Sequence, residues 1–237
     1  MTLIINTTQR TKETEIMDDF SLRGPVLHDT LRKLSLINKW LGGNEVTISG
    51  LKKLLLRHPK NKSISILDLG CGGGDTLRVV SKFGRKAGYS FELTGIDANP
   101  DVIEYAKSQA IDDEHINFLA CNIFSREFKL LDYDLVICSL FLHHFDEEQL
   151  FELLTFILRK TSMGILVNDL HRNSIAYLLF KSLGMFISNE MVVKDGLTSI
   201  RRGFKYEELK QLSERIESDY EISWKWAFRY QWLIRKK

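Results

Sequence analysis

The chain has 237 residues, of which 44% are hydrophobic and 27% charged, the balance of a soluble globular protein. Its length suits one domain of ordinary core size with an appended helical segment. The net charge of +2 is too small to argue for a polyanionic partner. Three cysteines do not make the disulfide framework of a secreted protein, so we expect a reduced, cytoplasmic location.

The N-terminal quarter of the chain predicts helices. Residues 1–13 resemble a loose tail, and a helical pattern runs from Glu15 to about His58. Leucine and isoleucine recur at three- and four-residue steps over 27–41, which is one face of an amphipathic helix, and 48–57 predicts a second helix. Residues 59–61 form a break. We therefore expect residues 1–61 to form an N-terminal helical segment that serves as a lid.

From residue 62 onward, short apolar strands alternate with helices. The expected strands are 63–69, 91–96, 116–120, 134–139 and 164–168, and the helices between them are 76–86, 100–110 and 147–160. Asn99 before Pro100, and Asp146 with Gln149, are helix start signals. This alternation predicts an α/β fold with a doubly wound, Rossmann-like and mostly parallel sheet, formed by residues 62–237.

The C-terminal third adds two features to this sheet. The runs 220–227 and 229–235 have no helix between them, so they predict an antiparallel hairpin at the sheet edge, preceded by a helix over 206–218. A helical insertion at about 173–204 is rich in apolar residues, and with the N-terminal helices it would roof an apolar pocket. The apolar stretch 175–187 is shorter than the ~20 residues of a membrane span, although peripheral membrane contact stays open.

Glycines directly follow the first strand, where residues 68–74 read Asp-Leu-Gly-Cys-Gly-Gly-Gly. Glycine lets the backbone pass close to a ligand, and the next helix offers unpaired N–H groups. The run lacks the lysine of a P-loop, and dinucleotide spacing would place Asp75 against a pyrophosphate, which is repulsive. The pattern that fits is acid-x-Gly-x-Gly-x-Gly, with Asp68, Gly70, Gly72 and Gly74.

This pattern resembles motif I of the class I S-adenosylmethionine (SAM)-dependent methyltransferases, whose ligand carries an amino acid moiety rather than a pyrophosphate. Asp97 ends the second strand about 20 positions beyond the last glycine, as expected for a carboxylate that accepts both ribose hydroxyls. The segment 120–123 resembles the part of this family that brackets adenine, with Asn122 where many members have Asp. The resemblance implies SAM as cofactor, held by Asp68, Gly70, Cys71, Gly72, Gly74, Asp97, Ala98, Asn122, Ile123, Ser139 and Leu140.

Candidate catalytic residues follow the fourth and fifth strands, which face the transferred methyl group in an open α/β sheet. His143 and His144 are candidate bases, because an imidazole titrates near neutral pH; the alternative is that one of them merely caps or packs against the next helix. His171 is another candidate base. Arg172 would hold an anionic oxygen or, alternatively, pair with Asp169 to fix the loop.

We expect no metal site from these histidines. Adjacent histidines such as His143 and His144 seldom converge on one metal together with His171, and no cysteine or acid with ligand spacing lies beside them. The segment after the fourth strand also lacks the Asn/Asp-Pro-Pro-Tyr/Phe motif of methyltransferases that act on DNA bases and protein amides.

The segments 17–20, 37–43 and 168–172 are similar to a bacterial subgroup of methyltransferases associated with polyketide-derived phenolic lipids or quinones. That resemblance implies O- or C-methylation of a small, largely apolar or aromatic acceptor. It also implies that the helix carrying Trp40 closes over the cofactor.

Three other functions remain in view. A tRNA or rRNA methyltransferase is suggested by residues 224–232, in which basic and aromatic residues are interleaved. A strand whose aromatic side chains are buried produces the same pattern. A nicotinamide oxidoreductase is disfavoured by Asp75 and by the lack of a Tyr-x-x-x-Lys pair. A non-catalytic SAM-binding protein is disfavoured only in part, because an intact cofactor motif says nothing about turnover.

Overall fold

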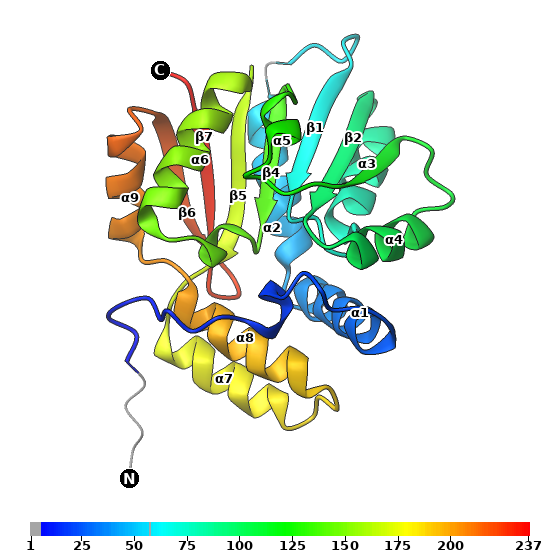
Figure 1. The fold of residues 1–237 in the computed structure, drawn as a ribbon. Helices are drawn as coiled ribbons and strands as arrows, with labels where there is room; N and C mark the ends of the chain where they lie inside the picture. Colours follow the sequence, from blue (N-terminus) through cyan, green and yellow to red (C-terminus); the bar gives the residue numbers. More distant parts are fainter. Residues whose placement is uncertain (1–5, 57) are drawn as a thin grey trace.

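The computed structural model describes residues 6–56 and 58–237 (Figure 1). Its core is a seven-stranded sheet in the order β3-β2-β1-β4-β5-β7-β6. The strands are β1 (Ile64–Leu69), β2 (Phe91–Asp97), β3 (Ile116–Ala120), β4 (Leu135–Ser139), β5 (Gly164–Leu170), β6 (Asp219–Lys225) and β7 (Arg229–Arg235). Strands β1 to β5 are parallel, and β7 pairs antiparallel with both β5 and β6. The predicted fold class and C-terminal hairpin are confirmed.

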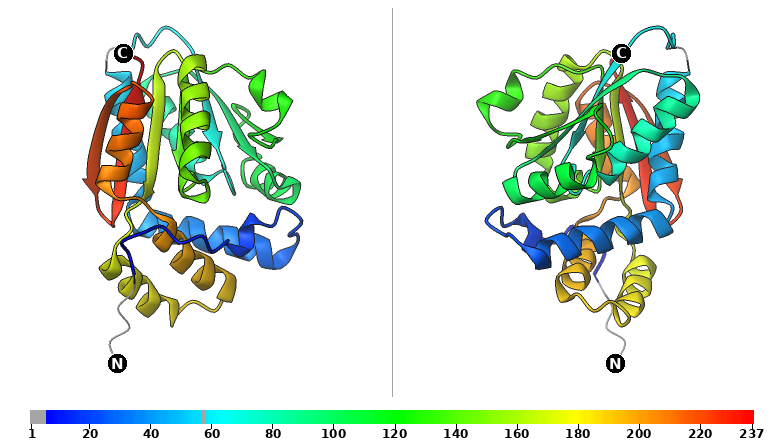
Figure 2. Two further views of the ribbon diagram at one scale, coloured as in Figure 1. Left: turned by 60° about the vertical axis from the view of Figure 1, so that its left-hand side comes forward. Right: turned by 90° about the vertical axis from the view of Figure 1, so that its right-hand side faces the viewer.

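Helices cover both faces of the sheet (Figures 1 and 2). One face packs against α5 (Arg126–Lys129), α6 (Glu147–Lys160) and α9 (Tyr206–Arg215), and the other against α2 (Gly43–Leu55), α3 (Asp75–Ala87) and α4 (Pro100–Gln109). Side chains of β4 alternate between the two cores: Val136 and Cys138 point to the first, Leu135 and Ile137 to the second. Burial on both faces explains why this strand is a continuous apolar run.

Local capping fixes where the helices begin. The Asn99 side chain accepts from the backbone N–H of Asp101 at 2.9 Å, and Asp146 with Gln149 forms the predicted capping box of α6. The expected second helix begins five residues earlier than predicted, at Gly43, because Gly42 adopts a φ of +73° and turns the chain directly into it.

The segment before residue 25 differs from the expectation. Instead of a helix from Glu15, it contains only the 3-10 turn η1 (Ile16–Asp18), and α1 (Pro25–Trp40) starts after Gly24. Nor is the start of the described chain loose: Arg10 donates to the carbonyl oxygens of His143 and Arg202, at 2.7 Å in both cases. Residues 1–5 of the predicted tail lie outside the described residues.

Helices α1, α7 (Ser174–Gly184) and α8 (Glu190–Arg202) lie together beyond the carboxyl ends of the parallel strands (Figure 2). The Asn189 side chain joins two of them, because its Nδ2 donates to Asp29 and Thr30 of α1, at 2.9 and 3.0 Å. The division of the chain at residue 61 and the description of 173–204 as an insertion remain predictions. Among the described helices, none has the length and apolarity to cross a bilayer.

Candidate active site

A cavity of about 570 Å³ opens between the carboxyl ends of the parallel strands and helices α1, α7 and α8. All but one of the predicted cofactor-binding residues line it: Asp68, Gly70, Cys71, Gly72, Asp97, Ala98, Asn122, Ile123, Ser139 and Leu140. The exception is Gly74, which is the N-cap of α3 with a φ of +73°. A Cβ on Gly74 would lie 2.5 Å from the Phe118 ring, so this glycine serves the packing of the turn.

At Gly70 the glycine loop leaves no room for a side chain. Gly70 has a φ of +64°, and a Cβ there would lie 2.1 Å from Phe141 Cδ2. The backbone of the loop therefore passes close to the space that a ligand would occupy.

The Asp97 carboxylate is held at the rim of this loop by backbone donors. Its Oδ1 accepts from Asn99 N at 3.0 Å and its Oδ2 from Gly72 N at 3.3 Å. Burial raises the pKa of Asp97 above its usual range. The position after β2 and the fixed orientation suit a carboxylate that accepts from a ribose diol.

Asp68 is the second acid of the cavity. It is 1% exposed, and among the described residues its Oδ1 has no hydrogen-bond partner. Burial, followed by the charges of Asp75 and Asp97, raises the pKa of Asp68 well above its usual range. Three neighbouring carboxyls with an unpaired oxygen favour a ligand that brings positive charge and hydroxyl donors, which fits the ammonium, sulfonium and ribose of SAM.

The predicted adenine segment lies at the same cavity. Asn122, Ile123 and Phe124 line the wall after β3. The Asn122 Oδ1 accepts from the backbone N–H of Phe124 at 2.9 Å, so this side chain stabilises the turn over 122–124.

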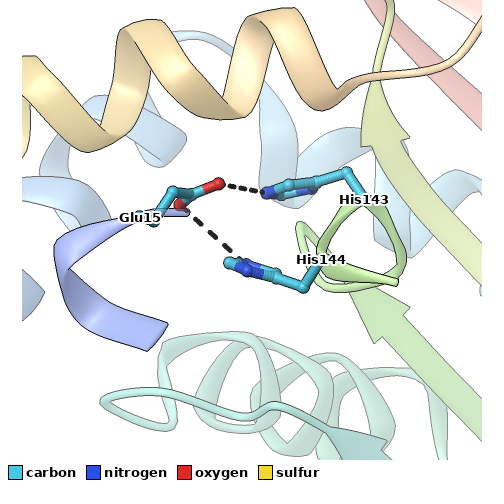
Figure 3. Close-up of side chains that lie close together, drawn as sticks. All are labelled: Glu15, His143 and His144. Atoms are coloured by element: carbon cyan, nitrogen blue, oxygen red, sulfur yellow. Dashed lines mark ion pairs between the residues drawn. The ribbon is translucent and has the colours of Figure 1, made fainter. Parts of the chain in front are cut away.

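Two adjacent histidines follow β4, on the short 3-10 turn η2 (Leu142–His144). His143 is 2% exposed, and its Nδ1 lies 2.7 Å from Asp169 Oδ1. Burial alone would lower the pKa of His143, but Asp169 and Glu15 raise it to about 9. His144 is 23% exposed, with its Nδ1 2.7 Å from Asp18 Oδ1. Both Nε2 atoms face Glu15, as Figure 3 shows.

His171 follows β5 and also lines the cavity, but it lies outside this pair. Its Nδ1 accepts from Trp224 Nε1 at 3.2 Å. Burial, with the charges of Lys205 and Arg172, lowers the pKa of His171 to about 4. The ring is therefore neutral near pH 7, with its proton on Nε2.

Arg172 neither holds an anionic oxygen in the cavity nor pairs with Asp169, the two roles that its position suggested. It is fully buried, and its guanidinium donates to Glu208 and to the carbonyl oxygen of Gly203 rather than to the cavity. The Asp169–Arg172 pair does not form, because Asp169 binds His143 instead. Burial alone would raise the pKa of Asp169, but the charge and hydrogen bond of His143 lower it.

Comparison with known proteins agrees with this arrangement. A family profile described as a methyltransferase domain matches residues 60–235. The chain belongs to this family of methyltransferase domains. A ubiquinone biosynthesis O-methyltransferase of Rickettsia typhi is 32% identical over 130 residues, 54% of this chain and 50% of the relative. The chain thus spans about half the length of the curated relative that it matches.

Solved structures share the fold of this methyltransferase. The plantazolicin methyltransferase BpumL, in complex with S-adenosylhomocysteine (SAH), superposes with a TM-score of 0.64 at 21% identity, over 90% of this chain and 95% of that one. Human N-acetylserotonin methyltransferase, in complex with SAM, gives a TM-score of 0.64 at 18% identity, over 89% and 55%. Both comparisons show that the chain has the same fold as these two proteins.

Sequence reasoning missed two carboxylates of the methyltransferase site. Glu15 and Asp18, from the η1 segment, contact the histidines that lie more than 120 positions later in the chain. Arg202 of α8 completes the group, because its Nη1 donates to Asp18 Oδ2 at 2.7 Å. For Asp18 the only signal was the similarity of segment 17–20 to a methyltransferase subgroup, which assigned it no role; no signal pointed to Glu15.

The methyltransferase cavity has an apolar roof. Leu31 and Leu34 of α1, Leu179 and Phe180 of α7 and Ile200 of α8 line it. The helix that carries Trp40 was expected to close over the cofactor; Trp40 itself is 87% exposed and is not part of the lining. Helix α1 thus covers the cavity with other residues of its inner face.

Proposed function

We propose that this methyltransferase transfers the methyl group of SAM to O or C of a small, largely apolar or aromatic acceptor, with a phenolic hydroxyl as the best candidate. The observation that carries the proposal is the placement of a histidine–carboxylate cluster in the wall of a cavity whose roof is apolar. The similarity to an enzyme named for O-methylation in ubiquinone biosynthesis supports the acceptor class.

The cofactor end of the cavity would be held by the acids. Asp97 would accept from the ribose hydroxyls and Asp68 from the ammonium of the amino acid moiety, directly or through water. SAM, when bound, supplies an electrophilic methyl group on a sulfonium. The chain aligns the acceptor with that methyl and excludes water beneath the lid formed by α1, α7 and α8.

Among the three predicted bases, we favour His144 as the group that takes the acceptor's proton. Its Nδ1 is bound to Asp18, which leaves Nε2 as the proton-accepting atom on the cavity side. His143 is too deeply buried to meet an acceptor and would position its neighbour. His171 is the weaker candidate, because its Nδ1 already accepts from Trp224 and its pKa is lowered to about 4.

The acceptor is tested with purified enzyme, SAM and a panel of alkylphenols, quinols and bulk tRNA. We expect methylated phenol or quinol, and a loss of about 10²- to 10⁴-fold in kcat for His144→Gln with SAH affinity retained. His115→Gln, at an exposed site away from the cavity, is the matched control. Methylation of tRNA alone would overturn the acceptor class and favour the RNA alternative.

A cytoplasmic location and a small-molecule partner complete the proposal. The three cysteines, Cys71, Cys121 and Cys138, are free, which is typical of a reducing compartment.

The aromatic residues of 224–232 are only partly in the core. Trp224 and Trp226 are about half or more exposed on the hairpin, whereas Tyr230 and Trp232 are buried.

A further inference from the structure

Three side chains from two distant segments direct their ligand atoms at one point of the cavity wall. Glu15 comes from the N-terminal segment, and His143 and His144 from η2 (Figure 3). Glu15 Oε1 lies 3.4 Å from His143 Nε2, and Glu15 Oε2 lies 4.0 Å from His144 Nε2. One ligand atom from each of the three residues lies within 4.8 Å of the other two.

Within the described part of the chain, two of these atoms are buried without a hydrogen bond, and their one mutual contact is the ion-pair distance of 3.4 Å. Glu15 is 8% exposed and His143 is 2% exposed, yet Glu15 Oε1 and His143 Nε2 make no hydrogen bond to any described residue. A hydrogen bond between charged groups is shorter, about 2.7–2.9 Å, so this pair leaves both atoms incompletely satisfied, and a cation that coordinates both would satisfy them.

The far nitrogen of each imidazole is held by a carboxylate. Asp169 Oδ1 lies 2.7 Å from His143 Nδ1, and Asp18 Oδ1 lies 2.7 Å from His144 Nδ1. Each carboxylate accepts from the Nδ1–H of its imidazole and aims Nε2 toward Glu15, where a metal ion would displace the Nε2 proton of His143. Carboxylate–histidine pairs of this kind orient the ligands of metal ions in proteins.

We infer that Glu15, His143 and His144 form a binding site for a divalent transition-metal cation of the zinc type, with one coordination position open to the cavity. Metal–ligand distances of about 2.0–2.2 Å separate neighbouring ligand atoms of a tetrahedral site by roughly 3.5 Å, close to the 3.4 Å between Glu15 Oε1 and His143 Nε2. His144 Nε2, 4.0 Å from Glu15 Oε2, would move inward to bind the same cation. Once a metal ion displaces the Nε2 proton of His143, Glu15, Asp18 and Asp169 outnumber the adjacent cations Arg10 and Arg202, so the bound cation would replace the charge of that proton.

This site differs from a metal site built from His143, His144 and His171, which the sequence made improbable. The third ligand is Glu15 rather than His171, which is bound to Trp224. The adjacent histidines converge because their rings lie side by side on η2, with centroids 4.3 Å apart and an interplanar angle of 31°.

The role of the cation rests on the proposed function. A hydroxyl of the acceptor would bind at the open position, forming a metal–oxygen bond and releasing its proton to solvent, and the resulting oxyanion would be held beside the cofactor site. With the cation bound, His144 Nε2 is a ligand; in the metal-free enzyme, the same atom is the base proposed above.

Cobalt(II) absorption provides a readout that does not depend on activity. The full chain, stripped with EDTA, is titrated with Co²⁺, and Zn²⁺ is then added in competition. We expect one equivalent of Co²⁺ with the intense visible bands of four- or five-coordination, displaced by Zn²⁺. Glu15→Gln and His144→Gln should abolish these bands, Asp18→Asn should weaken affinity about 10- to 100-fold, and His115→Gln should leave it unchanged.

SAH binding and thermal melting confirm that each variant is folded. Absence of stoichiometric Co²⁺ binding in the folded wild type, or equal binding by Glu15→Gln and His144→Gln, overturns the site. Methylation of a phenol by the EDTA-treated chain without Co²⁺ binding leaves the proposed function standing and removes the site. Co²⁺ binding with methylation of tRNA alone keeps the site and removes the proposed acceptor.

Discussion

At the scale of single residues, the Asp97 carboxylate is the clearest test of the cofactor site. In Asp97→Asn the side chain keeps its shape but loses its charge and one acceptor, while Gly72 N and Asn99 N still compete for the remaining oxygen. We expect SAH affinity, measured by calorimetric titration, to fall about 10- to 100-fold, because a hydrogen bond to a charged group contributes roughly 1.5–3 kcal/mol. The exposed Asp112→Asn should bind normally. Unchanged affinity in the Asp97 variant would contradict the ribose assignment.

Alanine variants of Gly70 and Gly88 distinguish two effects of adding a methyl group, namely backbone strain at positive φ and overpacking against a neighbour. Both have a positive φ, of +64° and +76°, but a Cβ on Gly70 meets Phe141 whereas a Cβ on Gly88 has no atom within 4 Å. Both alanine variants lose about 1–2 kcal/mol from the left-handed backbone, and Gly70→Ala loses a further 1–3 kcal/mol from overpacking. Urea denaturation measures the difference, and only the Gly70 variant should lose SAH binding. Equal losses would show that Phe141 moves aside freely.

At the scale of the elements, Asn189 connects α8 with α1. Its Oδ1 caps α8 by accepting from Val192 N at 3.2 Å, while its Nδ2 donates to Asp29 and Thr30 of α1. We expect Asn189→Ala to cost about 1 kcal/mol for the lost cap, and to speed hydrogen exchange in both α8 and α1.

The matched control is Asp146→Ala, which removes the cap of α6 without a bond to α1. It should cost a similar amount in urea denaturation and leave exchange in α1 unchanged. Slow exchange in α1 of the Asn189 variant would mean that helix packing, rather than this amide, holds α8 against α1.

How far the sequence predicts these elements depends on where the determining contacts lie. The strands and the strand-end residues of the site follow from apolar runs and from glycine positions, which are local. Strand β5 runs two residues past its predicted end because Asp169 and Leu170 pair with Tyr230 and Arg229 of β7. The pairing of Glu15 and Asp18 with the histidines depends on the chain folding back over the cavity, which no local pattern encodes.

At the scale of the whole molecule, His171 makes folding sensitive to acid. Its folded pKa of about 4 lies below the unfolded value of 6.5, so between these values the unfolded state binds more protons and stability falls as the pH falls. The slope is at most about 1.4 kcal/mol per pH unit, reduced by solvent screening because the ring is partly exposed. Above pH 6.5 this contribution is constant.

His171→Gln removes this titration and can still accept from Trp224. Urea denaturation between pH 4.5 and 7.5 should therefore give a shallower pH dependence for the variant than for the wild type. The lowered pKa values of the half-buried Asp18 and the buried Asp169 also make stability fall in acid, but both residues are present in both proteins, so their contributions cancel in the comparison. Parallel curves would mean that His171 titrates alike in both states.

The position of β7 has a consequence for how this enzyme is made. This strand comes after β6 in the chain, yet it lies between β5 and β6 in the sheet. During synthesis, the five parallel strands can assemble as soon as β5 emerges, but the free edge of β5 stays open until residues 229–235 have left the ribosome. Trp232, which is fully buried, is among the last core residues to arrive. An exposed edge strand is prone to pair with other chains, so the nascent protein is a natural client for chaperones that shield such edges.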